Sequence, residues 1–64
     1  MRLILRGGRV IDPASGRDEP ADVRIAADRI VGIVPAAAVA TAGHFAADRE
    51  IDARGLVVLP GLVD

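Results

Sequence analysis

The sequence consists of short apolar runs that are separated at short intervals by turn-forming residues. This pattern is typical of a β meander, and no long amphipathic helix is predicted. The first run covers residues 3–5 and ends at Gly7-Gly8, and the second is Val10-Ile11, which leads into residues 12–16. We therefore expect a hairpin with a turn at Gly7-Gly8. An exit turn follows over residues 12–16, where proline presets φ and glycine permits a positive φ.

A clean alternation of apolar and polar positions marks residues 22–26. Val23 and Ile25 fall on one face, and Asp22 falls with Arg24 on the other, as in an antiparallel strand with one solvated face. Residues 30–34 are predicted to pair back against this strand. The linking Ala27-Asp28 lacks the glycine that a tight two-residue turn prefers, so we expect a longer or a strained turn.

Residues 35–47 are interpreted as a variable loop or a short helix. Pro35 stands where a first helical turn tolerates proline, and Gly43 stands where a helix would end. A helix of one or two turns is marginal and this one has no apolar stripe, so a variable surface loop is the favoured interpretation. No function is assigned to the segment.

The last part of the chain is its most apolar part. Ile51 lies between Glu50 and Asp52 in a pattern of one inward and two outward positions, and residues 52–55 are predicted to turn. Residues 56–59 are apolar at every position, which suggests a strand buried on both sides. Pro60-Gly61 then bends the chain into residues 62–64, and an ending this apolar is expected of an interrupted domain.

Composition narrows the class of protein. Val and Ile outnumber Leu, which favours strands, and 64 residues suffice for one marginally stable small domain at most. A formal charge of −1 predicts no nucleic-acid partner. The absence of cysteine excludes disulfides and thiolate ligands and favours a reducing, cytoplasmic location. No apolar run is long enough for a membrane span or a signal peptide, so no membrane partner is expected.

Chemistry-bearing residues are few. His44 is the only imidazole, whereas a catalytic zinc needs three protein ligands, so we interpret His44 as a solvated loop residue. Ser15 lacks a nucleophile elbow and is expected to bond its own backbone. The carboxylates are all expected to be solvated, in turns or on outward strand positions: Asp12, Asp18, Glu19, Asp22, Asp28, Asp48, Glu50 and Asp52. From the residues alone, the chain contains no catalytic, cofactor-binding or metal-binding site.

Three stretches in order carry a resemblance to a known family: LILRGGRVIDPASG at 3–16, ADVRI at 21–25 with RIVGI at 29–33, and EIDARGLVVLPGLVD at 50–64. Together they resemble the N-terminus of the metal-dependent amidohydrolases, most closely dihydroorotase. The resemblance covers the chain apart from residues 35–47. Each stretch alone is ordinary strand and turn sequence, but the three in this order are specific for the superfamily.

The resemblance implies a mostly β fold. Residues 1–59 would be the N-terminal segment of a small composite β-sandwich, which strands from later in the same chain complete. Residues 60–64 would begin strand 1 of a (β/α)₈ barrel that is absent from this chain. The metal-binding His-x-His of the family would follow the position of Asp64, so the one or two Zn²⁺ ions would be bound outside these residues, and the segment itself would be structural and inactive.

For the full-length protein, the resemblance implies a homo-oligomeric hydrolase of a cyclic amide, with a small-molecule substrate. The dihydroorotase reaction converts N-carbamoyl-L-aspartate to dihydroorotate in pyrimidine biosynthesis. Hydantoinases, allantoinases and N-acyl-D-amino-acid deacylases begin in a similar way, so these three activities stay open. A free-standing β module that binds a partner through its edges is a third interpretation, which the apolar ending and the lack of protective lysines disfavour. The isolated chain is expected to self-associate or to be partly disordered.

Overall fold

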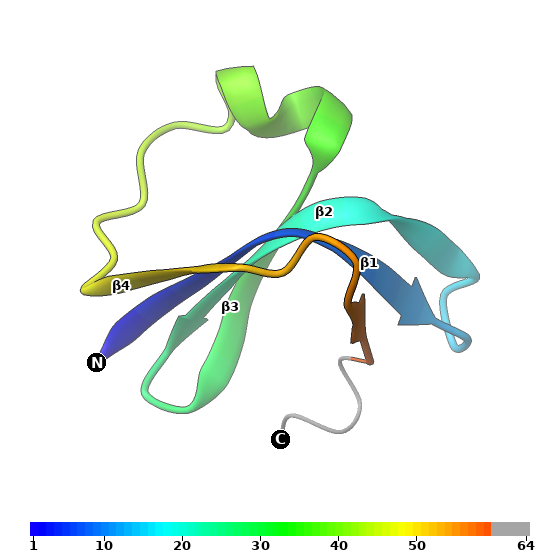
Figure 1. The fold of residues 1–64 in the computed structure, drawn as a ribbon, viewed down its shortest axis with the longest axis horizontal. Helices are drawn as coiled ribbons and strands as arrows, with labels where there is room; N and C mark the ends of the chain where they lie inside the picture. The colour runs from blue at the N-terminus through cyan, green and yellow to red at the C-terminus, as the bar shows by residue number, and fades with distance from the viewer. Residues whose placement is uncertain (60–64) are drawn as a thin grey trace.

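A computed structural model describes residues 1–59 of the chain. In chain order the elements are β1 (Arg2–Asp12), β2 (Arg17–Ala26), β3 (Arg29–Pro35), the 3₁₀ helix η1 (Ala36–Thr41), β4 (Arg49–Asp52) and β5 (Val57–Val58) (Figure 1). The fold is thus mostly β, as predicted. The predictions for residues 60–64, including the start of a barrel strand, lie outside the described residues. Among the described residues, no helix is long and apolar enough to cross a membrane.

β1 is the central strand of a mixed sheet. The strand order is β3-β2-β1-β4, and β5 also pairs with β1. The β1–β2 and β2–β3 pairs are antiparallel, whereas β4 and β5 both run parallel to β1. The first three strands therefore form a meander, in which one strand covers the two apolar runs at residues 3–5 and 10–11. The chain then crosses through η1 and the loop after it to the other side of β1, because a parallel partner needs a crossover connection.

Gly7-Gly8 is not a turn, so the prediction of a hairpin at this position was wrong. Both glycines lie inside β1, which is continuous over eleven residues. The register of β1 against β2 shifts between Leu5 and Gly8, and Gly7 has a φ of +71°. Glycine accommodates such a conformation at a β-bulge as readily as in a turn, and here it bends the strand without ending it.

β2 and β3 form the predicted hairpin. Ala26 pairs with Arg29, so the turn contains only Ala27 and Asp28. Both residues have positive φ, 52° and 62°, which matches a turn type that favours Asn-Gly. Of the longer turn and the strained turn that the sequence allowed, the structure therefore has the tight and strained one.

Of the two interpretations of residues 35–47, the short helix holds for residues 36–41. η1 follows Pro35, has no side-chain cap and contains no buried residue. A segment this short and unamphipathic forms a 3₁₀ turn more readily than an α-helix. Residues 43–47 are irregular.

The pairing register of the strands shows which residues share each face of the sheet. Leu5, Val23 and Ile33 are paired across three strands and share one face, and Ile51 on β4 pairs with Leu5 on the same face. We call this side the apolar face. The buried cluster of Val10, Ala21, Val23 and Val58 lies here, with Leu5, Ile25, Ile30 and Ile33 packed partly against it.

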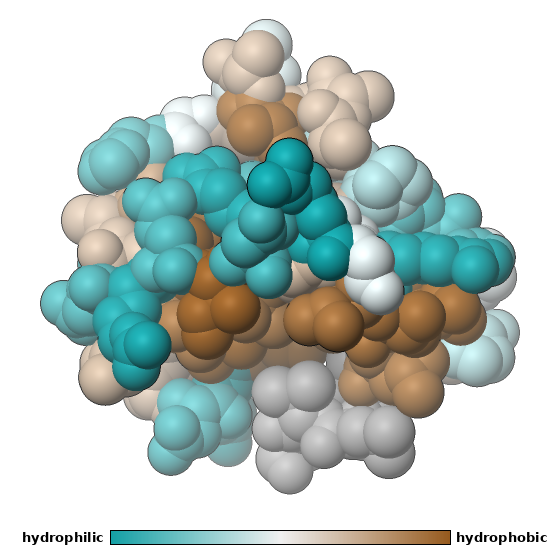
Figure 2. Space-filling model, in the orientation of Figure 1, coloured by the Kyte–Doolittle hydropathy of each residue, from teal (hydrophilic) through white to brown (hydrophobic). Residues whose placement is uncertain are grey.

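The expectation that residues 56–59 form a strand buried on both sides was wrong. β5 has only two residues, and only Val58 is buried, whereas Leu56, Val57 and Leu59 are 57%, 56% and 40% exposed. β5 pairs with β1 alone, so its side chains alternate between the core and solvent. In Figure 2 a band of hydrophobic surface lies below a hydrophilic band, on the side away from η1.

Candidate functional site

The opposite side of the sheet, which we call the η1 face, is polar and carries most of the side-chain network. Ile4, Arg24 and Glu50 share this face by register, and η1 with the following loop lies over it. The covering residues include Val39, His44 and Phe45. Because the crossover passes here, polar groups on this face are removed from water in part and need partners.

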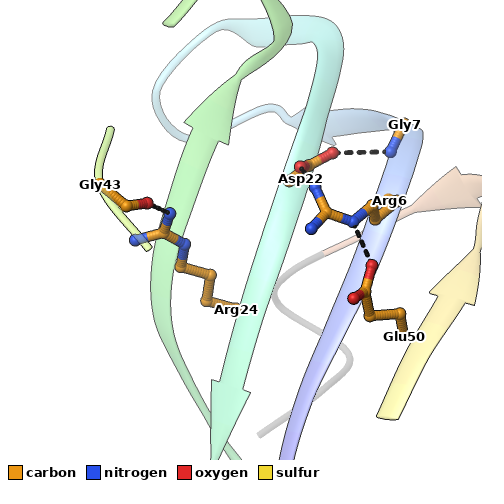
Figure 3. A network of polar contacts seen from close by, with 6 residues as sticks. All are labelled: Arg6, Gly7, Asp22, Arg24, Gly43 and Glu50. Carbon is orange, nitrogen blue, oxygen red and sulfur yellow. Dashed lines mark hydrogen bonds and ion pairs between the residues drawn. The ribbon is translucent and has the colours of Figure 1, made fainter. Parts of the chain in front are cut away.

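Asp22 is buried, so its prediction as a solvated carboxylate was wrong. It is 7% exposed, and its two oxygens have different partners. Oδ1 accepts a hydrogen bond from the Gly7 amide at 2.9 Å, and Oδ2 accepts one from Arg6 Nη1 at 3.1 Å (Figure 3). A buried carboxylate is tolerated because it is paired and hydrogen-bonded. Alternation predicted the correct face for Asp22, but the burial of that face comes from the crossover.

Arg6 lies between two carboxylates from neighbouring strands. Its Nη1 pairs with Asp22 on β2, and its Nε donates to Glu50 Oε1 on β4 at 2.5 Å (Figure 3). The hydrogen bond and charge of Glu50, followed by the charge of Asp22, raise the pKa of Arg6 above its ordinary value. Sequence reasoning did not single out Arg6. The available signal was an arginine beside a double glycine, with an Asp on the neighbouring strand.

A second group of contacts holds the loop after η1. Arg24 donates from Nη2 to the Gly43 carbonyl at 2.8 Å. The Arg2 and Arg24 guanidinium carbons lie 4.4 and 5.4 Å from the centroid of the Phe45 ring, which is cation–π range. Asp48 accepts a hydrogen bond from the Arg2 amide at 2.7 Å. These contacts attach the crossover to the sheet and use the only aromatic side chain of the sequence.

Two further ion pairs are exposed to solvent. Arg9 Nε lies 2.7 Å from Asp18 Oδ1, and Arg54 Nη2 lies 2.8 Å from Asp52 Oδ2. The Arg9 hydrogen bond lowers the pKa of Asp18, and the Arg54 hydrogen bonds lower the pKa of Asp52 to about 2. Such solvent-exposed pairs contribute little to stability. They match the sequence interpretation of these carboxylates as surface charges.

Ser15 and His44, which the sequence analysis considered as a nucleophile and as a metal ligand, lie in different loops. His44 is exposed in the loop after η1, and Ser15 is exposed in the turn between β1 and β2, where its Oγ lies 3.5 Å from the Asp12 carbonyl. Within residues 1–59, no group of three His, Asp or Glu side chains is placed to hold a metal ion. The polar contacts of the η1 face join guanidinium groups to carboxylates and to the Gly43 carbonyl. Within residues 1–59 they include no base set against a nucleophile.

The apolar face has a hollow at the β4–β5 end of the sheet. All its lining residues are apolar, and Ile51 on β4 is 37% exposed there. We call this feature the apolar hollow; it is lined by Leu5, Ile51, Ala53, Leu56, Val57, Val58 and Leu59. An apolar surface of this kind suits packing against further polypeptide better than binding a charged small molecule.

Comparison with curated proteins gives the class to which this segment is similar. The chain is 48% identical over 64 residues to a dihydroorotase-like protein of Pseudomonas aeruginosa and 45% identical over 64 residues to a dihydroorotase of Lactococcus lactis. It is 40% identical over 62 residues to an adenine deaminase of Cereibacter sphaeroides. These matches cover 100%, 100% and 97% of this chain. No protein-family model matches the chain, and no solved structure matches it significantly.

The chain spans only 14% of the length of the first two relatives and 10% of the third. It is similar to the N-terminal segment of amidohydrolases of the dihydroorotase and adenine deaminase type. The resemblance seen in the three sequence stretches is thereby confirmed. The two names with the higher identity refer to dihydroorotase.

Proposed function

We propose that residues 1–64 are the N-terminal scaffold of a zinc-dependent cyclic-amide hydrolase, a dihydroorotase that interconverts N-carbamoyl-L-aspartate and dihydroorotate. The observation that carries the proposal is the similarity to dihydroorotases along the entire chain. The scaffold role is supported by the two faces of the sheet. Ion pairs join the strands across the η1 face, while the lining of the apolar hollow includes exposed aliphatic side chains.

In this proposal, later strands of the same polypeptide pack on the apolar face and complete a β-sandwich, and the chain after β5 enters a (β/α)₈ barrel. Zinc would lower the pKa of a bound water and polarise the scissile carbonyl. The described residues do not fit a zinc site, because His44 is the only imidazole and no ligand cluster occurs among residues 1–59. No step of the reaction is therefore assigned to this segment.

The same proposal includes a cytoplasmic homo-oligomer that acts on a small molecule, without a nucleic-acid or membrane partner. The near-neutral charge supports the lack of a nucleic-acid partner, and the lack of cysteine supports the cytoplasmic location. Sedimentation of the complete gene product would test the oligomeric state, and a monomer would overturn that part.

A second candidate function is adenine deamination, because adenine deaminases match almost the whole chain at 40 to 42% identity. Hydantoinase, allantoinase and N-acyl-D-amino-acid deacylase activities are further candidates within the amidohydrolases. A β module that binds a partner without catalysis is the candidate from a different functional class.

The decisive experiment supplies the complete gene product with Zn²⁺ and offers dihydroorotate and adenine in parallel. Ring opening of dihydroorotate without ammonia release from adenine is expected. Deamination of adenine alone would replace the proposal with the second candidate. Inactivity toward both substrates would favour a hydantoinase, an allantoinase, a deacylase or a non-catalytic module. The 64-residue chain, assayed beside it, is expected to be inactive, and hydrolysis by this chain would contradict the scaffold role.

A further inference from the structure

β1 is irregular at one point on the side that faces β2. Leu5 pairs with Val23 and Gly8 pairs with Ala21, so two residues of β1 stand opposite Asp22 alone. This is the two-against-one count of a β-bulge, with its glycine at positive φ. The amide of that glycine donates to the Asp22 carboxylate at 2.9 Å, so a side chain replaces a backbone acceptor of the ladder.

The side of β1 that faces β4 and β5 is irregular at the same position along the strand. β4 ends at Asp52, opposite Arg6, and β5 resumes with Val57 opposite Arg9. Residues 53–56 make the turn between them, and its two ends are tied to β1. The Ala53 amide donates to the Arg6 carbonyl at 2.8 Å, and the Arg9 amide donates to the Leu56 carbonyl at 3.0 Å.

The turn fits closely against the bulge. A Cβ placed on Gly8 would lie 3.1 Å from Val58 Cγ2 and 3.2 Å from the Ala53 Cβ. Ala53 is 2% exposed, so the turn has little room to shift on that side. The position of β5 therefore depends on the path of β1 through the bulge.

Arg6 connects the two irregular sides. It pairs with Asp22, which accepts the bulge amide, and with Glu50, which lies two residues before the end of β4 (Figure 3). One guanidinium thus joins β2, β1 and β4 across the η1 face. Such charge-assisted bonds with directional geometry specify an arrangement more strictly than apolar contacts do.

We propose that Asp22 is a positioning residue, which fixes the β1 bulge directly and, through Arg6 and the 53–56 turn, the placement of β5 beside β1. In one respect the inference rests on the proposed function: the chain that leaves β5 would lead to the catalytic domain, so the bulge would set the direction of that exit. The placement of β5 itself is independent of any activity.

The test is amide hydrogen exchange by NMR on the complete gene product, isotope-labelled in residues 1–64 alone, with Asp22→Ala, Asp22→Asn and the matched control Asp18→Ala. Asp18 lies on the same strand, is exposed and also pairs with an arginine. Asp22→Ala is expected to speed exchange of the Gly7, Ala53 and Arg9 amides by about tenfold relative to the hairpin amides of β2 and β3. Asp18→Ala is expected to leave these ratios unchanged.

Asp22→Asn keeps an oxygen acceptor for the Gly7 amide but loses the charge that pairs with Arg6. It is expected to restore protection at Gly7 and to leave Ala53 and Arg9 partly exposed, which a merely structural role would not separate. Unchanged exchange at Gly7 in Asp22→Ala, or equal acceleration across the β2–β3 hairpin, would overturn the proposal.

If Asp22→Ala fails to fold, the Asp22→Asn variant decides. Protection at Gly7 with faster exchange at Ala53 and Arg9 supports the proposal, and unchanged exchange at Ala53 and Arg9 overturns it. Because the readout needs no substrate, an inactive gene product would refute the proposed function and leave this result intact.

Discussion

The two faces of the sheet differ in what holds them. On the η1 face, polar side chains meet partners from other strands: Asp22 reaches β1, Arg6 reaches β4 and Arg24 reaches the loop after η1. On the apolar face, a small cluster of buried aliphatic side chains lies beside the exposed residues of the apolar hollow. The first face is held by polar contacts within the described residues, around a pocket that Arg6, Asp22 and Glu50 help to line. The second presents surface of the kind that further polypeptide covers.

This contrast distinguishes the contacts made within the described residues from the apolar surface that those residues leave exposed. The polar pairs specify the register of the strands, and the aliphatic cluster supplies the burial free energy. Neither face brings together a nucleophile, a base or metal ligands among residues 1–59. The distribution supports the scaffold role proposed above.

The largest change in the free energy of unfolding is expected from a substitution in the buried cluster. Val23→Ala removes two methyl groups from a side chain with no exposed surface and should lower the free energy of unfolding by about 2 kcal/mol. Val31→Ala is the matched control, because Val31 is 57% exposed, and it should cost less than about 0.5 kcal/mol. Urea denaturation followed by circular dichroism measures both. Equal losses would show that the cluster is not the core.

The next largest change in stability is expected at the bulge. Gly7→Ala tests it, and Gly16→Ala is the matched control. Both glycines have positive φ, +71° and +72°, so each substitution should cost about 1 kcal/mol in backbone strain. A Cβ at Gly7 would also meet Arg54 Cγ at 2.9 Å, whereas nothing lies within 4 Å at Gly16. Gly7→Ala should therefore destabilise the chain by about 0.5 kcal/mol more in the same denaturation assay. A smaller cost at Gly7 would contradict the bulge geometry.

The hairpin turn offers a gain in stability. Ala27 and Asp28 both hold positive φ, so the double substitution Ala27→Asn with Asp28→Gly should relieve strain and stabilise the chain by about 1 kcal/mol. The melting temperature measures the change. The same pair of residue types placed at Ala37 and Ala38 in η1 serves as a control and should destabilise it, since neither position has positive φ.

The smallest effect is expected from an exposed ion pair. Hydrogen bonds from Arg54 depress the pKa of Asp52 to about 2 in the folded chain. A depressed carboxyl pKa contributes stability above the unfolded pKa, near about 4, and that contribution is lost as pH falls through the folded pKa. NMR titration of the Asp52 carboxyl carbon should show the low midpoint, and Arg54→Gln should return it toward the unfolded value. An unchanged midpoint in the variant would mean that Arg54 is not the cause.

Local patterns predicted the elements that depend on neighbours in sequence. The alternation around Val23 and Ile25 predicted β2, and the turns over residues 12–16 and 52–55 are present, with Leu56 donating to the Ala53 carbonyl at 2.9 Å. Ser15 lies in the predicted turn, and His44 is exposed in a loop, as the sequence indicated.

Features that depend on distant partners were missed. Gly7-Gly8 has the composition of a turn, and only Asp22 on one side and Val58 on the other show that it is a bulge. The burial of Asp22 comes from a crossover whose path the apolar pattern does not encode. The parallel pairing of β4 with β1 joins residues far apart in the chain, such as Leu5 and Ile51, so no local periodicity reports it.

Under the proposed function, this segment is a scaffold whose apolar face packs against further polypeptide. Since the sequence has no cysteine, Ile51→Cys places a single thiol at the apolar hollow, and Ala40→Cys places a control thiol on exposed η1. The measurement is the rate of thiol labelling at position 51 in the 64-residue chain at low concentration and in the complete gene product. We predict rapid labelling in the former, strong protection in the latter, and equal labelling of the control in both; equal labelling at position 51 in both proteins would contradict the account.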